Sequence, residues 1–251
     1  MKKNKVEIIA EIGVNHDGSF EKSIKLIQSA KKCGADTVKF QTFFSGEFVT
    51  QNTKKALYQL KTTSKKESHF DMINKLELSE YDFFRIINFC KKIKINFLST
   101  PYDLKSLEIL KKLKVPRYKT SSADLVDFML HKEIIKTKKP VIISTGMANL
   151  SEINDAINVC KKNGNKKIII LHCVSSYPAV INQSNVYTIV DLYKKFGLNI
   201  GLSDHTLSNS VSCTSIAFGA CLIEKHFTID KDTNSPDNKF SLLPHEFNQL
   251  A

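Results

Sequence analysis

The sequence has few of the features that mark membrane, disulfide-linked and nucleic-acid-binding proteins. No apolar run reaches the ~18 residues that a membrane-spanning helix needs. Six cysteines are scattered over 251 residues without a Cys-x-x-Cys pair, so we expect reduced thiols rather than a disulfide framework or a zinc ribbon. Only two of the 37 basic residues are arginine, the residue favoured for reading bases. The sequence therefore predicts a cytoplasmic protein with no membrane and no nucleic-acid partner.

The net charge of +12 comes from lysines that often stand in pairs near the expected ends of helices. Such pairs are Lys31-Lys32, Lys91-Lys92, Lys111-Lys112 and Lys161-Lys162. Lysine near a helix C-terminus complements the helix dipole, so the charge indicates a solvated surface that also attracts anionic ligands. The start, MKKNKVEIIAEIG, is basic, but Glu11 interrupts its short apolar part and no small-residue cleavage site follows. We therefore expect no signal peptide.

Eight short β-branched runs alternate with segments of helical periodicity. The predicted strands cover 6–13, 37–42, 95–100, 117–122, 140–145, 167–173, 198–203 and 221–227. Helix caps are predicted at Ser19, at Ser79 with Asp82, and at Asn149 with Glu152. Strand–helix alternation at this spacing predicts an α/β fold, a (β/α)₈ TIM barrel. A doubly wound open sheet is the alternative, but no Gly-x-Gly-x-x-Gly follows the first strand.

The barrel is expected to occupy residues 1–251 as a single domain. The gap at 43–77 is too long for a simple connection, so we expect short helices there that act as a lid or an interface. The final residues, PHEFNQLA, have the pattern of the first turns of a truncated closing helix, with no linker or second domain after them.

The stretch TVKFQT (37–42) places a lysine inside a strand that must bury both faces. At the carboxyl ends of barrel strands, inward residues face the active site, so Lys39 and Gln41 are expected to line a polar pocket. An anionic ligand would keep Lys39 charged there. Other strands end in similar residues: Glu11 followed by Asn15 and His16, Ser99, Thr100, Lys119, Ser121, Ser122, Ser144, Thr145, His172 followed by Ser175 and Tyr177, Asp204 with His205, and Glu224, Lys225 and His226. Two lysines with several hydroxyl groups suit a phosphate or a carboxylate.

Two histidines follow neighbouring strands. His205 and His226 should lie side by side at the rim, where two imidazoles with open positions suit Mn²⁺, Fe²⁺ or Zn²⁺ better than Mg²⁺. His16 and His172 are not expected to be ligands. The remaining histidines, His69, His131 and His245, are expected at the surface.

Seven ordered segments resemble the sialic acid synthase family, whose bacterial members make N-acetylneuraminate, legionaminate or pseudaminate. They are AEIGVNHDGSFEKSIKLIQSAKKCGADTVKFQTF, FLSTPYD, YKTSSADL, VIISTGMA, LHCVSSYPA, GLSDHT and EKHFT with SPDNKFSL. The resemblance implies a barrel that condenses phosphoenolpyruvate with the aldehyde of an N-acetylated hexosamine, N-acetylmannosamine or a 2,4-diacetamido analogue. The product is a nonulosonic acid, and phosphate is released. It also implies a homodimer.

Residue roles carried over from this resemblance fall into three groups. Glu11, Lys39 and Lys119 would be catalytic, with Glu11 as the acid/base. Phosphoenolpyruvate would bind to Lys39, Gln41, Thr100, Lys119, Ser122, Ser144 and Ser175. Tyr177 and Asp237 would place the sugar, and His205 and His226 would hold a divalent metal, Mn²⁺ or Mg²⁺.

Two departures from the family pattern leave alternatives open. Ser175 stands where some members carry Asn, and the C-terminal antifreeze-like domain of the family is expected to be absent. The alternatives are a non-catalytic or split-subunit barrel that retains the ligand site, and another phosphoenolpyruvate aldol-type synthase such as a 3-deoxy-octulosonate phosphate synthase.

Overall fold

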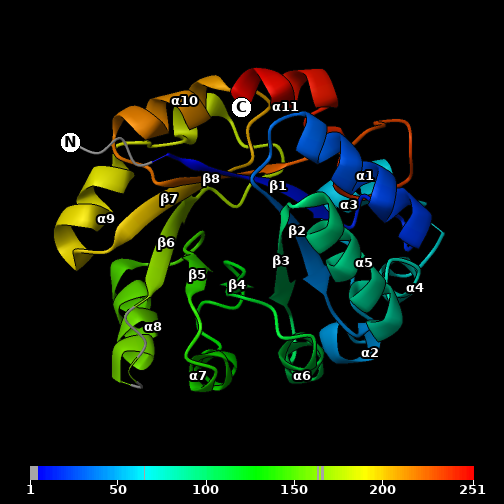
Figure 1. Ribbon diagram of the computed structural model, residues 1–251, viewed down its shortest axis with the longest axis horizontal. Helices are drawn as coiled ribbons and strands as arrows, with labels where there is room; N and C mark the ends of the chain where they lie inside the picture. The colour runs from blue at the N-terminus through cyan, green and yellow to red at the C-terminus, as the bar shows by residue number, and fades with distance from the viewer. Residues whose placement is uncertain (1–4, 65, 163, 165–166) are drawn as a thin grey trace.

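The protein folds into a nearly closed barrel of parallel strands surrounded by helices (Figure 1). The computed structural model describes residues 5–64, 66–162, 164 and 167–251. Within these residues the strands are β1 (Glu7–Gly13), β2 (Thr37–Thr42), β3 (Asn96–Pro101), β4 (Tyr118–Thr120), β5 (Val141–Ser144), β6 (Ile168–Cys173), β7 (Asn199–Asp204) and β8 (Leu222–His226). The predicted barrel and its eight strands are confirmed, with boundaries shifted by a few residues.

The helices alternate with these strands. They are α1 (Phe20–Lys32), α2 (Ser45–Phe48), α3 (Leu57–Thr62), α4 (His69–Asn74), α5 (Glu80–Ile93), α6 (Leu104–Lys112), α7 (Phe128–Lys136), α8 (Leu150–Lys162), α9 (Thr188–Phe196), α10 (Ser210–Ala217) and α11 (Pro244–Leu250), with 3₁₀ turns η1 (Ile181–Gln183) and η2 (Asn238–Phe240). In the described residues, no helix is long and apolar enough to cross a bilayer.

Local chemistry explains where the helices begin. Ser19 Oγ accepts the Lys22 N–H and starts α1, and Ser79 with Asp82 forms a reciprocal capping box at α5. Asn149 Oδ1 accepts the Glu152 N–H before α8, while the Glu152 carboxylate accepts the Asn149 N–H. All three predicted caps are confirmed.

The strand order is β3-β2-β1-β8-β7-β6-β5-β4, and all the strand ladders in the described residues are parallel. The two end strands, β3 and β4, lie side by side, as Figure 1 shows, but no ladder joins them within the described part of the chain. The barrel is therefore one sheet whose two edges meet at a seam between β3 and β4.

The barrel interior is built in layers. At the amino ends of the strands, Arg117 donates to both Glu7 oxygens and to Thr37. The next layer is apolar and consists of Ile9, Leu98, Ile142, Leu171 and Leu222. Gly201 leaves room in this layer, since a Cβ there would lie 2.6 Å from the Leu222 carbonyl oxygen. Two residues further along each strand the interior becomes polar, so the apolar layer is the floor beneath the polar mouth.

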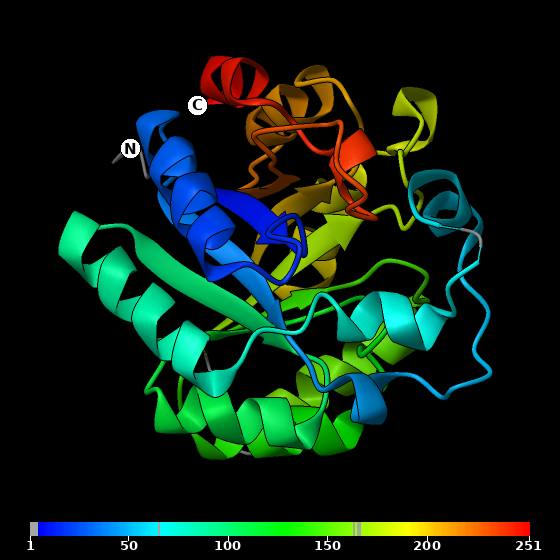
Figure 2. The ribbon, with the colours of Figure 1, turned by 90° about the vertical axis from the view of Figure 1, so that its right-hand side faces the viewer.

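The connection between β2 and α5 carries the short helices that its length predicts. Figure 2 shows α2, α3 and α4 beside the ends of the strand arrows, outside the ring formed by the other helices. Lys55, whose side chain is 3% exposed, binds the Glu67 carboxylate at 3.0 Å and the Ser64 carbonyl at 2.8 Å. The insertion is thereby tied into a defined shape over the mouth of the barrel.

Candidate active site

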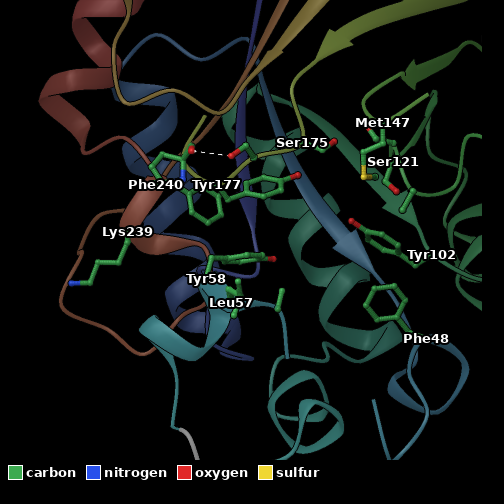
Figure 3. Close-up of a pocket in the computed structure, with 15 residues that line it drawn as sticks. Phe48, Leu57, Tyr58, Tyr102, Ser121, Met147, Ser175, Tyr177, Lys239 and Phe240 are labelled. Atoms are coloured by element: carbon green, nitrogen blue, oxygen red, sulfur yellow. Dashed lines mark hydrogen bonds between the residues drawn. The ribbon is translucent and has the colours of Figure 1, made fainter. Parts of the chain in front are cut away.

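A cavity of about 810 Å³ opens at the carboxyl ends of the strands. Its outer wall is largely aromatic: Phe48 and Tyr58 come from the insertion, Tyr102 follows β3, Tyr177 follows β6, and Phe240 lies in η2 (Figure 3). The Tyr177 ring lies 5.3 Å from Tyr58 and 5.0 Å from Phe240 between centroids. Segments far apart in the sequence thus form one apolar rim.

Charged side chains meet at the bottom of this mouth. Lys39 Nζ lies 3.0 Å from Glu11 Oε1 and 3.5 Å from Glu224 Oε1, and Lys119 Nζ lies 4.0 Å from the same Glu224 oxygen. All four side chains are buried. Gln41 donates to Glu11 at 3.2 Å. Lys39, the lysine inside the strand TVKFQT, therefore faces a buried polar site, as expected.

Burial and neighbouring charges shift these pKa values in different directions. Burial would lower the pKa of Lys39, but the carboxylates of Glu11 and Glu224 raise it above its usual value. Burial lowers the pKa of Lys119, an effect that Glu224 only partly offsets. Burial raises the pKa of Glu11 despite the nearby Lys39, whereas the two lysines lower that of Glu224 against the effect of burial. Glu224 is therefore the lasting counter-charge, and Glu11 is the carboxyl that more readily holds a proton.

Hydroxyl groups lie beside Lys119 and beside Gly146, which follows β5. Its ammonium donates to Ser144 Oγ at 2.6 Å and to the Thr120 carbonyl at 3.0 Å. Ser122 Oγ accepts the Gly146 N–H at 2.9 Å, and Ser175 Oγ is buried without a hydrogen-bond partner among the described residues. A Cβ at Gly146 would lie 2.2 Å from Ser175 Oγ and 2.9 Å from Ser122 Oγ. Gly146 therefore keeps open a small hollow lined by hydroxyl groups.

On the opposite side, Lys39 reaches Thr100 Oγ1 at 3.5 Å. Thr100 lies on β3, next to the seam, and Lys119 lies on β4 across it. The hydroxyl and ammonium groups thus come from both edges of the sheet, and an oxyanion placed among them would be in reach of several donors.

The two predicted metal ligands also lie together. The rings of His205 and His226 are 5.5 Å apart between centroids, and Tyr177 packs 4.3 Å from His205. His205 Nδ1 lies 2.8 Å from the Val174 carbonyl oxygen, so Nδ1 is the donor and Nε2 is the nitrogen that can ligate when the ring is neutral. His226 Nδ1 is buried without a hydrogen-bond partner in the described chain.

Asp237 completes this side of the site. Its Oδ2 is 3.8 Å from His226 Nδ1, and burial together with repulsion from Glu11 raises the pKa of Asp237 to about 7. In the described residues, no group of three His, Cys, Asp or Glu side chains is arranged to hold a metal. The residues present fit a metal through two imidazole nitrogens, with water and substrate oxygens filling the other positions.

The structure brings every candidate residue to one end of the barrel, although the role of each stays a prediction. They are Glu11, Lys39, Gln41, Thr100, Lys119, Ser122, Ser144, Ser175, Tyr177, His205, His226 and Asp237. Sequence analysis placed Glu224 at a strand end without giving it a role, and it missed Ser203, which donates to Glu224 at 3.0 Å. Both have the strand parity of the neighbouring histidines, His226 and His205, and that parity could have assigned them to the site.

Two surface predictions were wrong. His131 is fully buried in α7, where its neighbours Leu130 and Ile134 are also buried. His69 is half-buried and borders a smaller cavity next to Tyr58 and Asp237, because α4 folds over the mouth. His245 is exposed, as predicted. His16 Nδ1 accepts the Gly18 N–H, and His172 Nε2 contacts the Ser184 carbonyl, so both rings have local partners.

Fold and site together define a (β/α)₈ barrel with a cationic pocket at the carboxyl ends of its strands. The chain belongs to the NeuB family, whose model matches residues 26–251. It is 46% identical over 249 residues to the N,N'-diacetyllegionaminic acid synthase of Campylobacter jejuni, covering 98% of this chain and 75% of that protein. It is 33% identical to the pseudaminic acid synthase of Helicobacter pylori, covering 98% of this chain and 72% of that protein.

A solved structure agrees. The N-acetylneuraminic acid synthetase of Leptospira borgpetersenii, in complex with citrate, superposes with a TM-score of 0.87 at 32% identity. The match covers 98% of this chain and 81% of that one. The resemblance to the sialic acid synthase family and the predicted fold are therefore confirmed.

Proposed function

We propose that this protein condenses phosphoenolpyruvate with the open-chain aldehyde of an N-acetylated hexosamine to give a nonulosonic acid and phosphate. The sugar would be N-acetylmannosamine or its 2,4-diacetamido analogue. The relatives support this, since they are named as synthases of diacetyllegionaminic, pseudaminic and N-acetylneuraminic acids. A cytoplasmic location and a homodimer are also proposed, and light scattering on the purified protein tests the dimer.

The observation that carries the proposal is the meeting of Lys39 and Lys119 around Glu224 in a buried site. Phosphoenolpyruvate bears a carboxylate and a phosphate, so it needs two cationic centres and several hydrogen-bond donors. The two ammonium groups lie within 3.5 and 4.0 Å of one Glu224 oxygen, and they donate to Thr100 and Ser144. Lys39 has Glu11 and Glu224 beside it, whereas Lys119 has only Glu224 at 4.0 Å, so an anionic ligand would supply the counter-charge that Lys119 lacks.

The aromatic cavity above the lysines suits the sugar. N-acetyl groups have apolar methyls that pack against rings such as Tyr58, Tyr177 and Phe240. Tyr177 lines this cavity, Asp237 lines the smaller cavity that Tyr58 and Tyr177 also border, and both offer polar atoms to hydroxyl groups. The sugar would thus enter last and cover phosphoenolpyruvate, excluding water from the charged layer.

The chemistry forms one carbon–carbon bond. The bond forms between C3 of phosphoenolpyruvate and the aldehyde carbon, and positive charge develops at C2. Water adds at C2, and the C2–O bond to phosphate then breaks, which leaves the ketone. Glu11 is placed to move protons, because burial raises its pKa while Lys39 holds it at 3.0 Å. Lys39 and Lys119 stabilise the charges on the carboxylate and the departing phosphate.

A divalent metal, Mn²⁺ or Mg²⁺, belongs to this proposal. His205 Nε2 and the His226 ring would hold it, and its chemistry is to polarise the aldehyde oxygen as a Lewis acid. Tyr177, which packs against His205, would keep the sugar aldehyde on this side of the cavity.

The test is a phosphate-release assay with mass analysis of the product. Metal-replete protein is incubated with phosphoenolpyruvate and each of three acceptors: N-acetylmannosamine, its 2,4-diacetamido-6-deoxy analogue, and a pentose 5-phosphate. We expect turnover with one of the first two. Turnover with the sugar phosphate alone would instead identify another phosphoenolpyruvate aldol-type synthase, and phosphoenolpyruvate binding without turnover would favour a non-catalytic or split-subunit barrel.

A further inference from the structure

Lys225 occupies the position on β8 just before His226 and points away from the cavity. Side chains alternate along a strand, so a neighbour of the cavity-facing His226 must face the outer layer. Its side chain is 1% exposed. The ammonium contacts groups at the end of β7 and in the loop after it: Asp204 Oδ2 at 2.7 Å, the Thr206 carbonyl at 2.6 Å, the Ser208 carbonyl at 2.9 Å and Thr206 Oγ1 at 3.3 Å. Lys225 therefore ties this loop to β8.

Asp204 closes the same loop from the other side. Its Oδ2 also accepts a hydrogen bond from Ser212 Oγ of α10 at 2.6 Å, and its Oδ1 accepts the Thr206 N–H at 2.8 Å. His205 stands between Asp204 and Thr206 in the chain. The backbone on both sides of the His205 ring is thus held by the Asp204–Lys225 pair.

The pair begins where the backbone ladder stops. The β7–β8 ladder ends at the pair of Asp204 and Lys225, and His205 and His226 are the next residues along the chain. Beyond that point the loop is held by the contacts of the Lys225 ammonium and by the Ala179 N–H, which donates to the His205 carbonyl at 3.0 Å. The backbone that carries the His205 ring is therefore held to β8 by this side-chain cluster, while the Val174 carbonyl oxygen contacts the ring itself.

We propose that Lys225 and Asp204 are positioning residues that set the separation of the His205 and His226 rings. The proposal rests on the proposed function in one respect, because it takes metal binding to be the task of the two rings. A pair that serves stability alone would change melting when removed and leave the rings as they are. Removing a pair that positions the rings would change metal binding even in a variant that still folds.

The test removes both charges together. Replacing one partner would strand a buried charge and endanger folding, whereas the double variant Asp204→Leu with Lys225→Met leaves neither ion unpaired. Mn²⁺ affinity is measured by calorimetry without substrates. We expect it to weaken by about 10- to 100-fold, as is typical when groups that orient metal ligands are lost. Phosphoenolpyruvate affinity, which depends on β2, β4 and β5, should not change.

A matched control removes an ion pair at the other end of the barrel. Glu7→Gln with Arg117→Met should lower stability without altering Mn²⁺ affinity. Amide hydrogen exchange over residues 204–209, in metal-free protein, gives a readout that needs no metal, and we expect protection to fall in the double site variant only. Unchanged exchange in the folded variant would overturn the proposal. If the wild type binds no Mn²⁺, the metal part of the proposed function fails and the exchange result alone decides the positioning role.

Discussion

Replacing Lys119 with methionine distinguishes two roles for this lysine: binding the ligand and stabilising the fold. The ammonium is buried, and burial lowers its pKa below the usual value, so the charged form costs free energy in the folded state. Methionine has similar length and no charge. It relieves that cost and gives up the 2.6 Å bond to Ser144 and the 4.0 Å contact with Glu224. We expect the ligand-free stability to stay within about 1 kcal/mol of the wild type.

Ligand binding should respond in the opposite way. Phosphoenolpyruvate at about 100 times its Kd stabilises the wild type by about 2.7 kcal/mol, or roughly 5–11 °C in Tm for a chain of this size. Loss of a charge-assisted hydrogen bond of about 2–3 kcal/mol weakens binding roughly 30- to 150-fold. At the same ligand concentration the shift in the Lys119→Met protein then falls to about 1–3 °C.

Thermal denaturation with and without phosphoenolpyruvate measures both quantities. Lys139→Met is the control, because this half-buried lysine donates to the Val115 carbonyl at the amino end of the barrel and should keep the full ligand shift. A structural role for Lys119 predicts instead a loss of about 3–5 kcal/mol without ligand. If Tm falls that far while the phosphoenolpyruvate shift persists, the assignment of Lys119 to the ligand is wrong.

Three further predictions follow from the same contacts. Burial lowers the pKa of His16 to about 3, below its ordinary 6.5, so its contribution to stability is complete above pH 6.5 and is lost on acidification. Between pH 6 and 4, urea titrations should show that the free energy of unfolding of His16→Asn falls by about 1.4 kcal/mol less per pH unit than that of the wild type. Equal slopes would contradict this prediction. Gly146→Ala should weaken phosphoenolpyruvate binding by about tenfold or more with little change in Tm, because the new methyl would lie 2.2 Å from Ser175 Oγ. Calorimetry measures the affinity, and an undiminished affinity would rule out the hollow as the anion site. Chelation should abolish phosphate release until Mn²⁺ is restored, and His226→Ala should raise the Mn²⁺ concentration required; turnover that survives the chelator would exclude a metal role.

Strand periodicity was sufficient to predict the barrel and to place Lys39 and Lys119 in one pocket, because inward residues at strand ends share one mouth. Sequence analysis placed Glu224, Lys225 and His226 of CLIEKHF together at the end of a strand. Strict alternation would have kept Glu224 and His226 in the site and turned Lys225 outward, where it binds Asp204. His131 was misplaced because it is polar, although Ile134 and Ile135 at helical spacing indicate a buried face. The shape of residues 43–77 depends on long-range contacts such as Lys55 with Glu67, which periodicity does not encode.

The seam between β3 and β4 gives bound substrate a mechanical role. Lys39 stands on β2, beside one margin of the sheet, and Lys119 on β4 forms the other. An anion bound by both ammonium groups would link the two edge regions of the sheet where no backbone ladder joins β3 to β4 in the described residues. Bound phosphoenolpyruvate would then limit how often β3 and β4 separate, and in the ligand-free protein the barrel would open first between these two strands.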